Sequence, residues 1–291
     1  MATAGSKPSA GRDGVFISVD MEGMAGVVHL HQVMRGTPEY ERSCRLMTAE
    51  TNAAVAGARR AGATRFLVND SHGDMRNFLL DELDDGVEVI SGADKSYSMG
   101  AGLDPTFEVA FFVGYHASVG TELAIMDHTY GGRTVYALRI NGRAQSEATL
   151  NAALAGTFGV RTALITGDRA TIDEAAAELP GIEGVVVKEA LGRQAARSLH
   201  PVEACRRIEE GAYRAYADQA VRPLYRPQGP FTLEIDWMNA SMADLCAQLP
   251  DIERAGGRTS RYRSPDFQTC YRVLLALLGM AAPAAYQYPR P

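Results

Sequence analysis

The chain has 291 residues, of which 46% are hydrophobic and 22% charged, and its formal net charge is −6 at pH 7. These totals are typical of a globular protein with one large domain or two smaller ones. The acidic balance argues against nucleic acid as a partner, because phosphate binding requires a basic surface. No apolar run reaches the roughly 18 residues that a membrane helix needs, so we expect no membrane partner.

Residues 1–13 are small and polar and lack the apolar segment of a secretory signal, so we expect a disordered tail there. The cysteines are scattered along the chain and form no CxxC pair: Cys44, Cys205, Cys246 and Cys270. This spacing favours free thiols in a reducing compartment over a disulfide framework or a thiolate zinc site. We therefore expect a cytoplasmic protein.

Short apolar strands alternate with helices along the first two thirds of the chain. A strand at 15–19 precedes a helix that we expect to start at Thr37-Pro38 and to stop at Gly62. The Asn141-Gly142 dipeptide predicts a tight turn, and Ser146 is a candidate helix cap. Further strands are predicted at 65–69, 87–91, 108–114, 134–140, 161–166 and 184–189, and further helices at 146–159 and 171–179. This alternation predicts an α/β fold with a mainly parallel sheet flanked by helices.

The last third of the chain is predicted to form a smaller α/β portion. An amphipathic helix at 202–218 is followed by a proline-rich break, a strand at 231–239 and a helix at 266–279. We expect a catalytic α/β domain over 14–195 and a C-terminal helix and strand portion over 196–291, the latter a candidate for forming the assembly. The leucines of the last helix, 274, 275, 277 and 278, are predicted to belong to the core or to a subunit interface.

Polar side chains follow several of the predicted strands. Asp20 and Glu22 come directly after the first strand, and Asn69, Asp70, Ser71 and His72 follow the second. His116 follows the strand at 108–114, and Glu147 starts the helix after the Asn141-Gly142 turn. Ligands bind beyond the carboxyl ends of the strands in open α/β sheets, so these groups are expected to converge.

Asp20 and Glu22 would share one face of an extended chain, where two close carboxylates repel each other. A bound cation would offset this repulsion, and Asp20 could bridge two ions. Carboxylates and imidazoles without cysteine are typical of hydrolytic zinc or manganese sites. A two-metal site stabilises both the attacking and the leaving group of a displacement reaction, and it makes hydroxide available near pH 7.

Each of these residues also has an ordinary structural interpretation. Asp20 and Glu22 could cap a turn, Asp70 and Ser71 are common turn residues, and Glu147 suits the first turn of a helix. We prefer a shared site because all of these interpretations would have to hold at one sheet edge. His128, in a glycine-flanked loop, is a surface histidine or else a general base or nucleophile. For His29, His31 and His200 we favour structural roles.

Five motifs occur in the same order as in a known family: SVDMEG, VNDSHG, FFVGYHA, HTY and LNAALAG. Over residues 14–280 the chain resembles the zinc-dependent D-aminopeptidases of the DppA type, the M55 metallopeptidases. The resemblance implies two zinc ions per subunit, with ligand positions at Asp20, Glu22, His72, His116 and Glu147, and a catalytic role for His128. It also implies a homodecamer that admits short peptides.

Two positions depart from the family pattern, since Ser146 stands where glycine is usual and Ser118 where a basic residue is common. Substrate-binding residues are not identified, and amide hydrolysis is a firmer expectation than selectivity for D-residues. The expected function is therefore a binuclear zinc aminopeptidase or amidohydrolase, with manganese as an alternative metal. Hydrolysis of a natural-product amide or of a phosphoester is the alternative, and a non-catalytic metal-binding scaffold ranks last.

Overall fold

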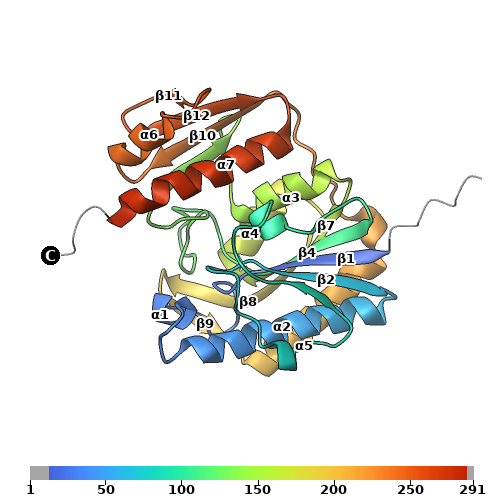
Figure 1. Ribbon diagram of the computed structural model, residues 1–291. Helices are drawn as coiled ribbons and strands as arrows, with labels where there is room; N and C mark the ends of the chain where they lie inside the picture. Colours follow the sequence, from blue (N-terminus) through green and yellow to red (C-terminus); the bar gives the residue numbers. More distant parts are fainter. Residues whose placement is uncertain (1–12, 287–291) are drawn as a thin grey trace, which may run out of the picture.

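A computed structural model describes residues 13–286. The predicted disordered tail lies outside the described residues except for Asp13. Two β-sheets with their helices make up the described chain, and Figure 1 shows the second sheet stacked above the first. The prediction of an α/β fold with a mainly parallel sheet is confirmed.

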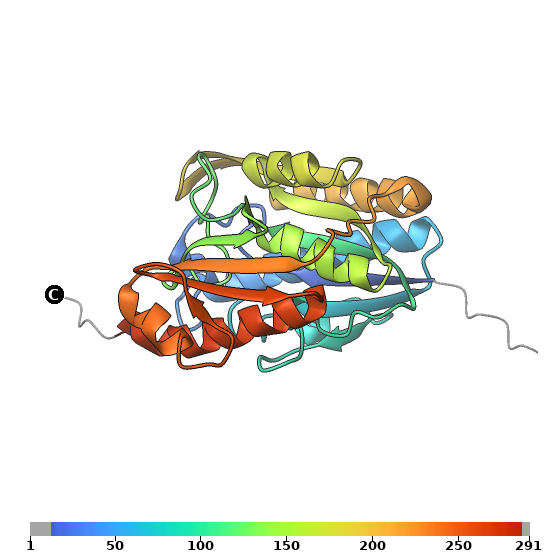
Figure 2. The ribbon, with the colours of Figure 1, turned by 90° about the horizontal axis from the view of Figure 1, so that it is seen from above.

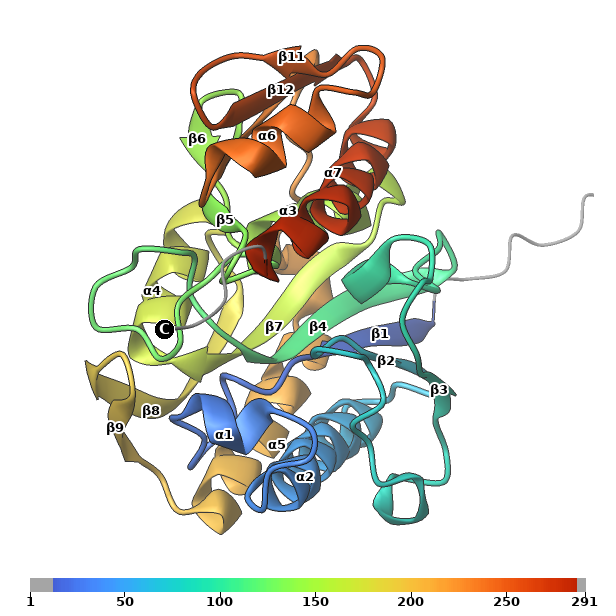
Figure 3. The same cartoon turned by 60° about the vertical axis from the view of Figure 1, so that its left-hand side comes forward.

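The first sheet has seven strands in the order β3-β2-β1-β4-β7-β8-β9 (Figure 3). All neighbouring pairs are parallel except β8 with β9. Its strands are β1 (Gly14–Val19), β2 (Arg65–Asp70), β3 (Glu88–Ile90), β4 (Phe107–Tyr115), β7 (Arg161–Asp168), β8 (Glu183–Gly192) and β9 (Ala195–Ser198). The central strands β1 and β4 are buried on both faces, as their continuous apolar sequences require.

Helices cover both faces of this sheet. Helices α2 (Tyr40–Arg60) and α5 (Pro201–Ala217) pack together on one face, where Val15 and Ile17 of β1 meet them. Helices α3 (Glu147–Thr157) and α4 (Arg169–Glu178) cover the other face, against Phe16. Figure 3 shows the short helix α1 (Leu30–Val33) on the same side as α2.

The second sheet is antiparallel, in the order β11-β12-β10-β5-β6. Its strands are β5 (Val135–Ile140), β6 (Arg143–Ala144), β10 (Phe231–Trp237), β11 (Glu253–Arg254) and β12 (Thr259–Ser264). Helices α6 (Ala240–Cys246) and α7 (Phe267–Ala281) pack against it, and Figure 2 shows α7 (red) alongside β10 (orange). Short 3-10 helices are η1 (Leu80–Glu82), η2 (Ser98–Gly100), η3 (Gln219–Val221) and η4 (Ala282–Tyr286).

The predicted division into residues 14–195 and 196–291 remains a prediction, and strand pairing does not follow it. β5 and β6 come from the first segment but pair within the second sheet. α5 comes from the second segment but packs against α2 on the first sheet. The two segments therefore exchange elements.

Local signals were correct at one turn and wrong at one helix start. Asn141 and Gly142 have φ of 52° and 78°, which is the backbone of the predicted tight hairpin turn. Helix α2, however, begins at Tyr40 and not at Thr37-Pro38. The Thr37 hydroxyl donates instead to the carbonyls of His31 and Met34, so it braces the preceding loop.

Residues Phe267–Ala285 form a helical stretch that is long and apolar enough, by length and composition, to cross a membrane. Leu274, Leu277 and Ala281 in this stretch are buried in the core of the second sheet. A core helix of a globular protein has the same length and composition.

Candidate metal centre

The structure brings all the predicted site residues to the carboxyl edge of the first sheet. Asp20 and Glu22 follow β1, and His72 follows β2. His116 follows β4, whose parallel neighbour is β1. The set is completed by His128 in the loop between β4 and β5 and by Glu147, the first residue of α3.

Glycines allow the loops after β1 and β4 to meet. A Cβ atom on Gly23 would lie 2.0 Å from the Tyr115 carbonyl oxygen, and one on Gly114 would lie 2.4 Å from the carbonyl oxygen of Asp20. The Gly23 amide donates to the Gly114 carbonyl at 2.7 Å. The glycine of the SVDMEG motif is therefore required by the close approach of two backbones.

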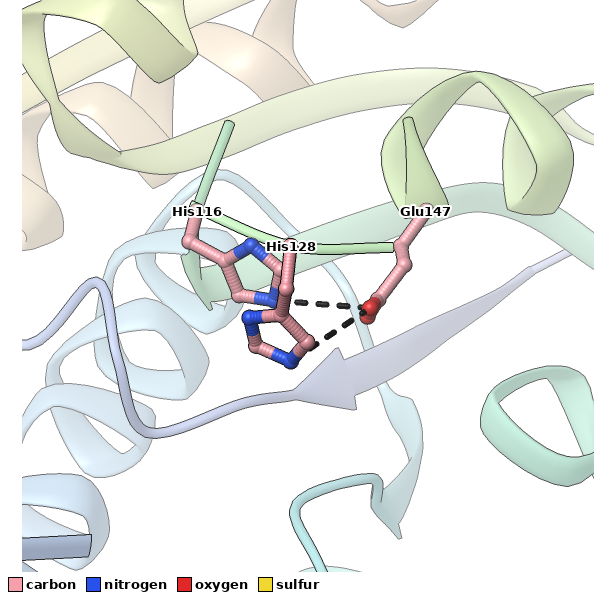
Figure 4. Close-up of side chains that lie close together, drawn as sticks. All are labelled: His116, His128 and Glu147. Carbon is pink, nitrogen blue, oxygen red and sulfur yellow. Dashed lines mark ion pairs between the residues drawn. The ribbon is translucent and has the colours of Figure 1, made fainter. Parts of the chain in front are cut away.

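Asp20, Glu22 and His72 form the first group, with ligand atoms all within 4.8 Å of one another. Nδ1 of His72 lies 3.1 Å from Oδ1 of Asp20 and 2.9 Å from Oε2 of Glu22. His116, His128 and Glu147 form the second group and point toward one another in Figure 4. Oε1 of Glu147 lies 3.4 Å from Nε2 of His116 and 3.9 Å from Nε2 of His128.

Asp20 joins the two groups. Its Oδ1 faces His72, while its Oδ2 lies 3.3 Å from Nε2 of His116. One carboxylate thus presents an oxygen to each side, which is the arrangement of a ligand that bridges two cations.

Backbone carbonyls fix the orientation of each imidazole. Nε2 of His72 lies 2.8 Å from the Val33 carbonyl, and Nδ1 of His116 lies 3.0 Å from that of Ala117. Nδ1 of His128 lies 2.8 Å from the Met126 carbonyl. Because those nitrogens donate outward, the other ring nitrogen of each neutral histidine presents a lone pair to the centre.

Burial and charge oppose each other in this centre. Burial disfavours charge on His72, but Glu22 and Asp20 raise its pKa well above the usual range. Burial acts in the same way on His116, and Glu147 and Asp20 raise its pKa well above the usual range. Burial raises the pKa of Glu22 in turn, yet His72 and the other histidines lower it well below its usual value. The carboxylates therefore require nearby positive charge, from protons or from cations.

The donor atoms fit a divalent cation. Nε2 of His116 is buried without a hydrogen-bond partner. Oε2 of Glu22 is also buried and makes no hydrogen bond, although it lies within ion-pair distance of His72. Unpartnered buried polar atoms are costly, and metal coordination would satisfy both of these. Imidazole nitrogens with carboxylate oxygens are a ligand set that suits zinc.

Sequence reasoning missed the residues that hold the ligand loops. Nζ of the buried Lys188, in β8, donates to the carbonyls of Glu22, Met24 and Val27 at 2.5, 2.9 and 2.5 Å. Burial lowers the pKa of Lys188 to about 8. The buried Glu50 accepts from the Ala25 amide at 2.8 Å. A lysine inside the apolar run GVVVKE was the available signal for the first of these.

A buried hydrogen-bond network lies beneath the second group. The backbone amide of Tyr130 donates to Oε1 of Glu147 at 2.6 Å, and the Tyr130 hydroxyl pairs with that of Tyr271. Tyr271 donates to Asn151, and Asn151 donates to the Tyr115 hydroxyl at 2.9 Å. The network thus connects α7 of the second sheet to α3 and β4 of the first.

Of the other polar candidates, Ser71 lines the cavity of the metal centre, whereas Asp70 makes hydrogen bonds within its own loop. The Asp70 carboxylate accepts from the amide and side chain of Asn77, whose side chain also donates to the His72 carbonyl. His29 and His31 pack edge to face at 4.8 Å. A cavity adjoins the metal centre, and neither His29 nor His31 is among the residues found to line it. Arg76, an exposed arginine four residues after His72, is not among them either, whereas Arg133 is.

The centre opens into a cavity of about 480 Å³. Its lining includes the proposed ligands Asp20, Glu22, His72 and Glu147 and apolar residues of α7 and η4. A volume of this size suits a small molecule or a short peptide.

Comparisons with known proteins found a matching family model, a similar protein and a similar solved structure. A family model described as D-aminopeptidase, peptidase family M55, matches residues 14–276. A D-aminopeptidase of Bacillus subtilis (strain 168) is 35% identical over 271 residues, which are 92% of this chain and 97% of that protein. A solved structure, the Zn-dependent D-aminopeptidase DppA from Bacillus subtilis, described as a self-compartmentalizing protease, superposes with a TM-score of 0.88. It is 33% identical, with 92% of this chain and 98% of that chain covered.

Proposed function

This chain belongs to the M55 family of D-aminopeptidases, and we propose that it is a binuclear zinc aminopeptidase that releases N-terminal amino acids, D-residues among them, from short peptides or amides. The observation that carries the two-ion proposal is the Asp20 carboxylate, which faces His72 with one oxygen and His116 with the other. The solved DppA structure, described as Zn-dependent, supports zinc as the metal.

In this proposal Asp20, Glu22 and His72 would hold one ion, and Asp20, His116 and Glu147 would hold the other. Bound zinc would supply Lewis acidity, which polarises a carbonyl group and makes hydroxide available near neutral pH. Manganese is the alternative metal, because oxygen and imidazole ligands accept both.

His128 is the proposed catalytic residue. It is less buried than His116, lines the cavity, and lies farther from Glu147 than His116 does. Its Nε2 faces the centre while its Nδ1 is held by the Met126 carbonyl. Nε2 is thereby oriented to take the proton of the attacking water and return it to the leaving amine, or to stabilise the developing oxyanion.

The alternative, hydrolysis of a natural-product amide or a phosphoester, is not favoured, since both relatives are D-aminopeptidases. We further propose a cytoplasmic homo-oligomer, a decamer by family resemblance. The description of DppA as self-compartmentalizing supports assembly, and the free thiols Cys44, Cys205, Cys246 and Cys270 support a reducing compartment.

The test is elemental analysis of freshly purified protein, run in parallel with hydrolysis of paired D- and L-amino acid amides. The expected result is close to two zinc ions per chain and release of the D-amino acids. Two zinc ions with activity on L-amides alone would overturn the assignment of D-residues. Protein that neither contains zinc nor takes it up would overturn the metal centre itself.

A further inference from the structure

Helix α7 and the following η4 carry two apolar stripes. The first is buried in the core of the second sheet and consists of Leu274, Leu277, Ala281 and Ala284. The second, which we call the cavity stripe, lines the cavity of the metal centre and consists of Leu275, Leu278, Ala282 and Ala285. Its members recur three or four residues apart, so they share one helix face.

Two methionines line the same cavity. Met75 belongs to the loop that carries His72, and its amide donates to the His72 carbonyl at 2.7 Å. Met99, in η2, is buried at the cavity wall, and the Asn69 side chain donates to its carbonyl at 2.7 Å. Methionine side chains adapt to apolar groups of different shapes.

The cavity lining therefore combines ionisable residues with apolar ones. Ligand sites are built in this way, with a few polar groups that fix orientation and apolar walls that supply binding free energy. Leu275, Leu278 and Ala285 of the cavity stripe also pack against the edge of this core, but they are only partly buried there, and the first stripe supplies its fully buried side chains. The stripe lines the same cavity as Asp20, Glu22 and Glu147, so it presents apolar surface to whatever binds beside the metal centre.

We infer that the cavity stripe binds an apolar side chain next to the scissile amide, so that the preferred substrates are short peptides or amides with a hydrophobic residue at the cleaved bond. This inference rests on the proposed aminopeptidase function and adds the substrate class. One additional methylene in an apolar pocket changes kcat/KM by about 10- to 200-fold. Leucyl substrates should therefore exceed alanyl ones by at least about tenfold.

The chain offers a matched pair of variants on one helical stretch. Ala282 and Ala276 are both exposed, but only Ala282 belongs to the cavity stripe. Ala282→Leu adds bulk inside the cavity, and Ala276→Leu adds the same bulk outside it. Neither replaces a buried side chain, so both variants should fold.

The experiment measures kcat/KM of the zinc-loaded enzyme for two substrate series. Amino acid amides vary the released residue through alanine, leucine, phenylalanine and glutamine, and alanyl dipeptides vary the second residue in the same way. We expect wild type to prefer leucine and phenylalanine over glutamine in one of the series. Ala282→Leu should reduce that preference by at least about tenfold, and Ala276→Leu should match wild type.

Two results would overturn the inference while leaving the proposed function intact. One is hydrolysis without preference for leucine over glutamine in either series. The other is an unchanged preference in Ala282→Leu, above all if this variant alone changes the oligomeric state, because the stripe would then meet another copy of the chain. Failure of the proposed function is different, since neither series would then be hydrolysed.

A binding measurement separates selectivity from turnover. Isothermal titration calorimetry of the zinc-loaded protein with free leucine and free alanine, in both stereochemical forms, reports affinity without catalysis. If the stripe binds the released residue, leucine should bind more tightly than alanine to wild type and to Ala276→Leu, and Ala282→Leu should lose the difference. If selectivity lies in the dipeptide series instead, free leucine is again the product that carries the selected side chain, so the same titrations apply.

Discussion

The imidazole rings of His116 and His128 stack, with centroids 3.9 Å apart and planes inclined by 14°. Both rings turn Nε2 toward Oε1 of Glu147, yet the two side chains differ in burial, with 2% of His116 and 19% of His128 exposed. The buried ring suits a metal ligand, and the more exposed ring, which lines the cavity, suits a group that exchanges protons with substrate and water.

We expect His128→Ala to lower kcat by about 10²- to 10⁴-fold, the usual contribution of a general acid or base, while zinc content stays at the wild-type level. His116→Ala, the neighbouring control, should lose zinc together with activity. Steady-state kinetics and elemental analysis on the same preparations distinguish a catalytic residue from a metal ligand. Loss of zinc from His128→Ala would make His128 a ligand instead.

Asp20→Asn should weaken both metal positions, because one side chain faces both groups. Glu22→Gln affects only the first group, so it should leave one zinc ion per chain while Asp20→Asn leaves less than one. Zinc per chain after dialysis against a weak chelator is the measurement. Equal losses in the two variants would contradict a bridging role for Asp20.

Arg133 is the single lysine or arginine found among the described residues that line the cavity. A hydrogen bond to a charged group contributes about 1.5–3 kcal/mol. Binding of a substrate carboxylate by Arg133 would therefore raise kcat/KM by about tenfold or more. We expect Arg133→Met to lower kcat/KM for a free dipeptide by that factor relative to the same dipeptide with a C-terminal amide.

The control for this comparison is Arg76→Met. Arg76 is exposed and pairs with Asp74 at 2.6 Å, and it does not belong to the cavity lining. This variant should treat the free and amidated dipeptides as wild type does. If Arg133→Met does so as well, Arg133 takes no part in recognising the carboxylate.

Glu50 should make stability depend on pH. Burial raises its pKa from 4.5 to about 7, although the Ala25 amide and Lys188 oppose the shift. Between these pH values the folded protein keeps a proton that the unfolded chain loses. The free energy of unfolding should therefore fall as pH rises from 4.5 to 7, by up to about 3 kcal/mol from this group.

Glu50→Gln keeps an acceptor for the Ala25 amide and removes the titration. Its stability relative to wild type should rise across that pH window and level off above pH 7, as measured by urea unfolding at several pH values. Glu41→Gln, the same exchange at an exposed position of α2, is the matched control. If the free energy of unfolding depends on pH in the same way in wild type and Glu50→Gln, this prediction is contradicted.

The first sheet and the polar strand ends could be predicted because the signals are local. The apolar run of β1 stops at Asp20, and Ser146 caps α3 by accepting from the Thr149 amide, as its sequence indicates. The start of α2 could not be predicted in this way, because Thr37 has a hydroxyl that serves a cap or a loop equally well. Its contacts with His31 and Met34, set by the loop, decide between them.

The division of the strands between the two sheets could not be predicted from the sequence either. β5 has the alternating pattern of a strand, but nothing local says that β10, almost a hundred residues later, is its neighbour. Likewise, the leucine pattern of the last helix predicted a core or interface position but did not show which leucines face the core. Only packing against the second sheet buries Leu274 in the core and leaves Leu278 partly buried, where it also lines the cavity.

From its sequence alone, this protein is determined to have an α/β fold, a set of carboxylates and imidazoles at strand ends, and a resemblance to zinc D-aminopeptidases, because strand period, turn chemistry and short motifs are local properties. The tertiary structure decided that Asp20 faces two groups at once, that Lys188 holds the loop of Glu22, and that α7 lines the cavity. These relations join residues far apart in the chain. Strand order within the first sheet brings Asp20, His72, His116 and Lys188 together, and the packing of the second sheet against the first adds α7.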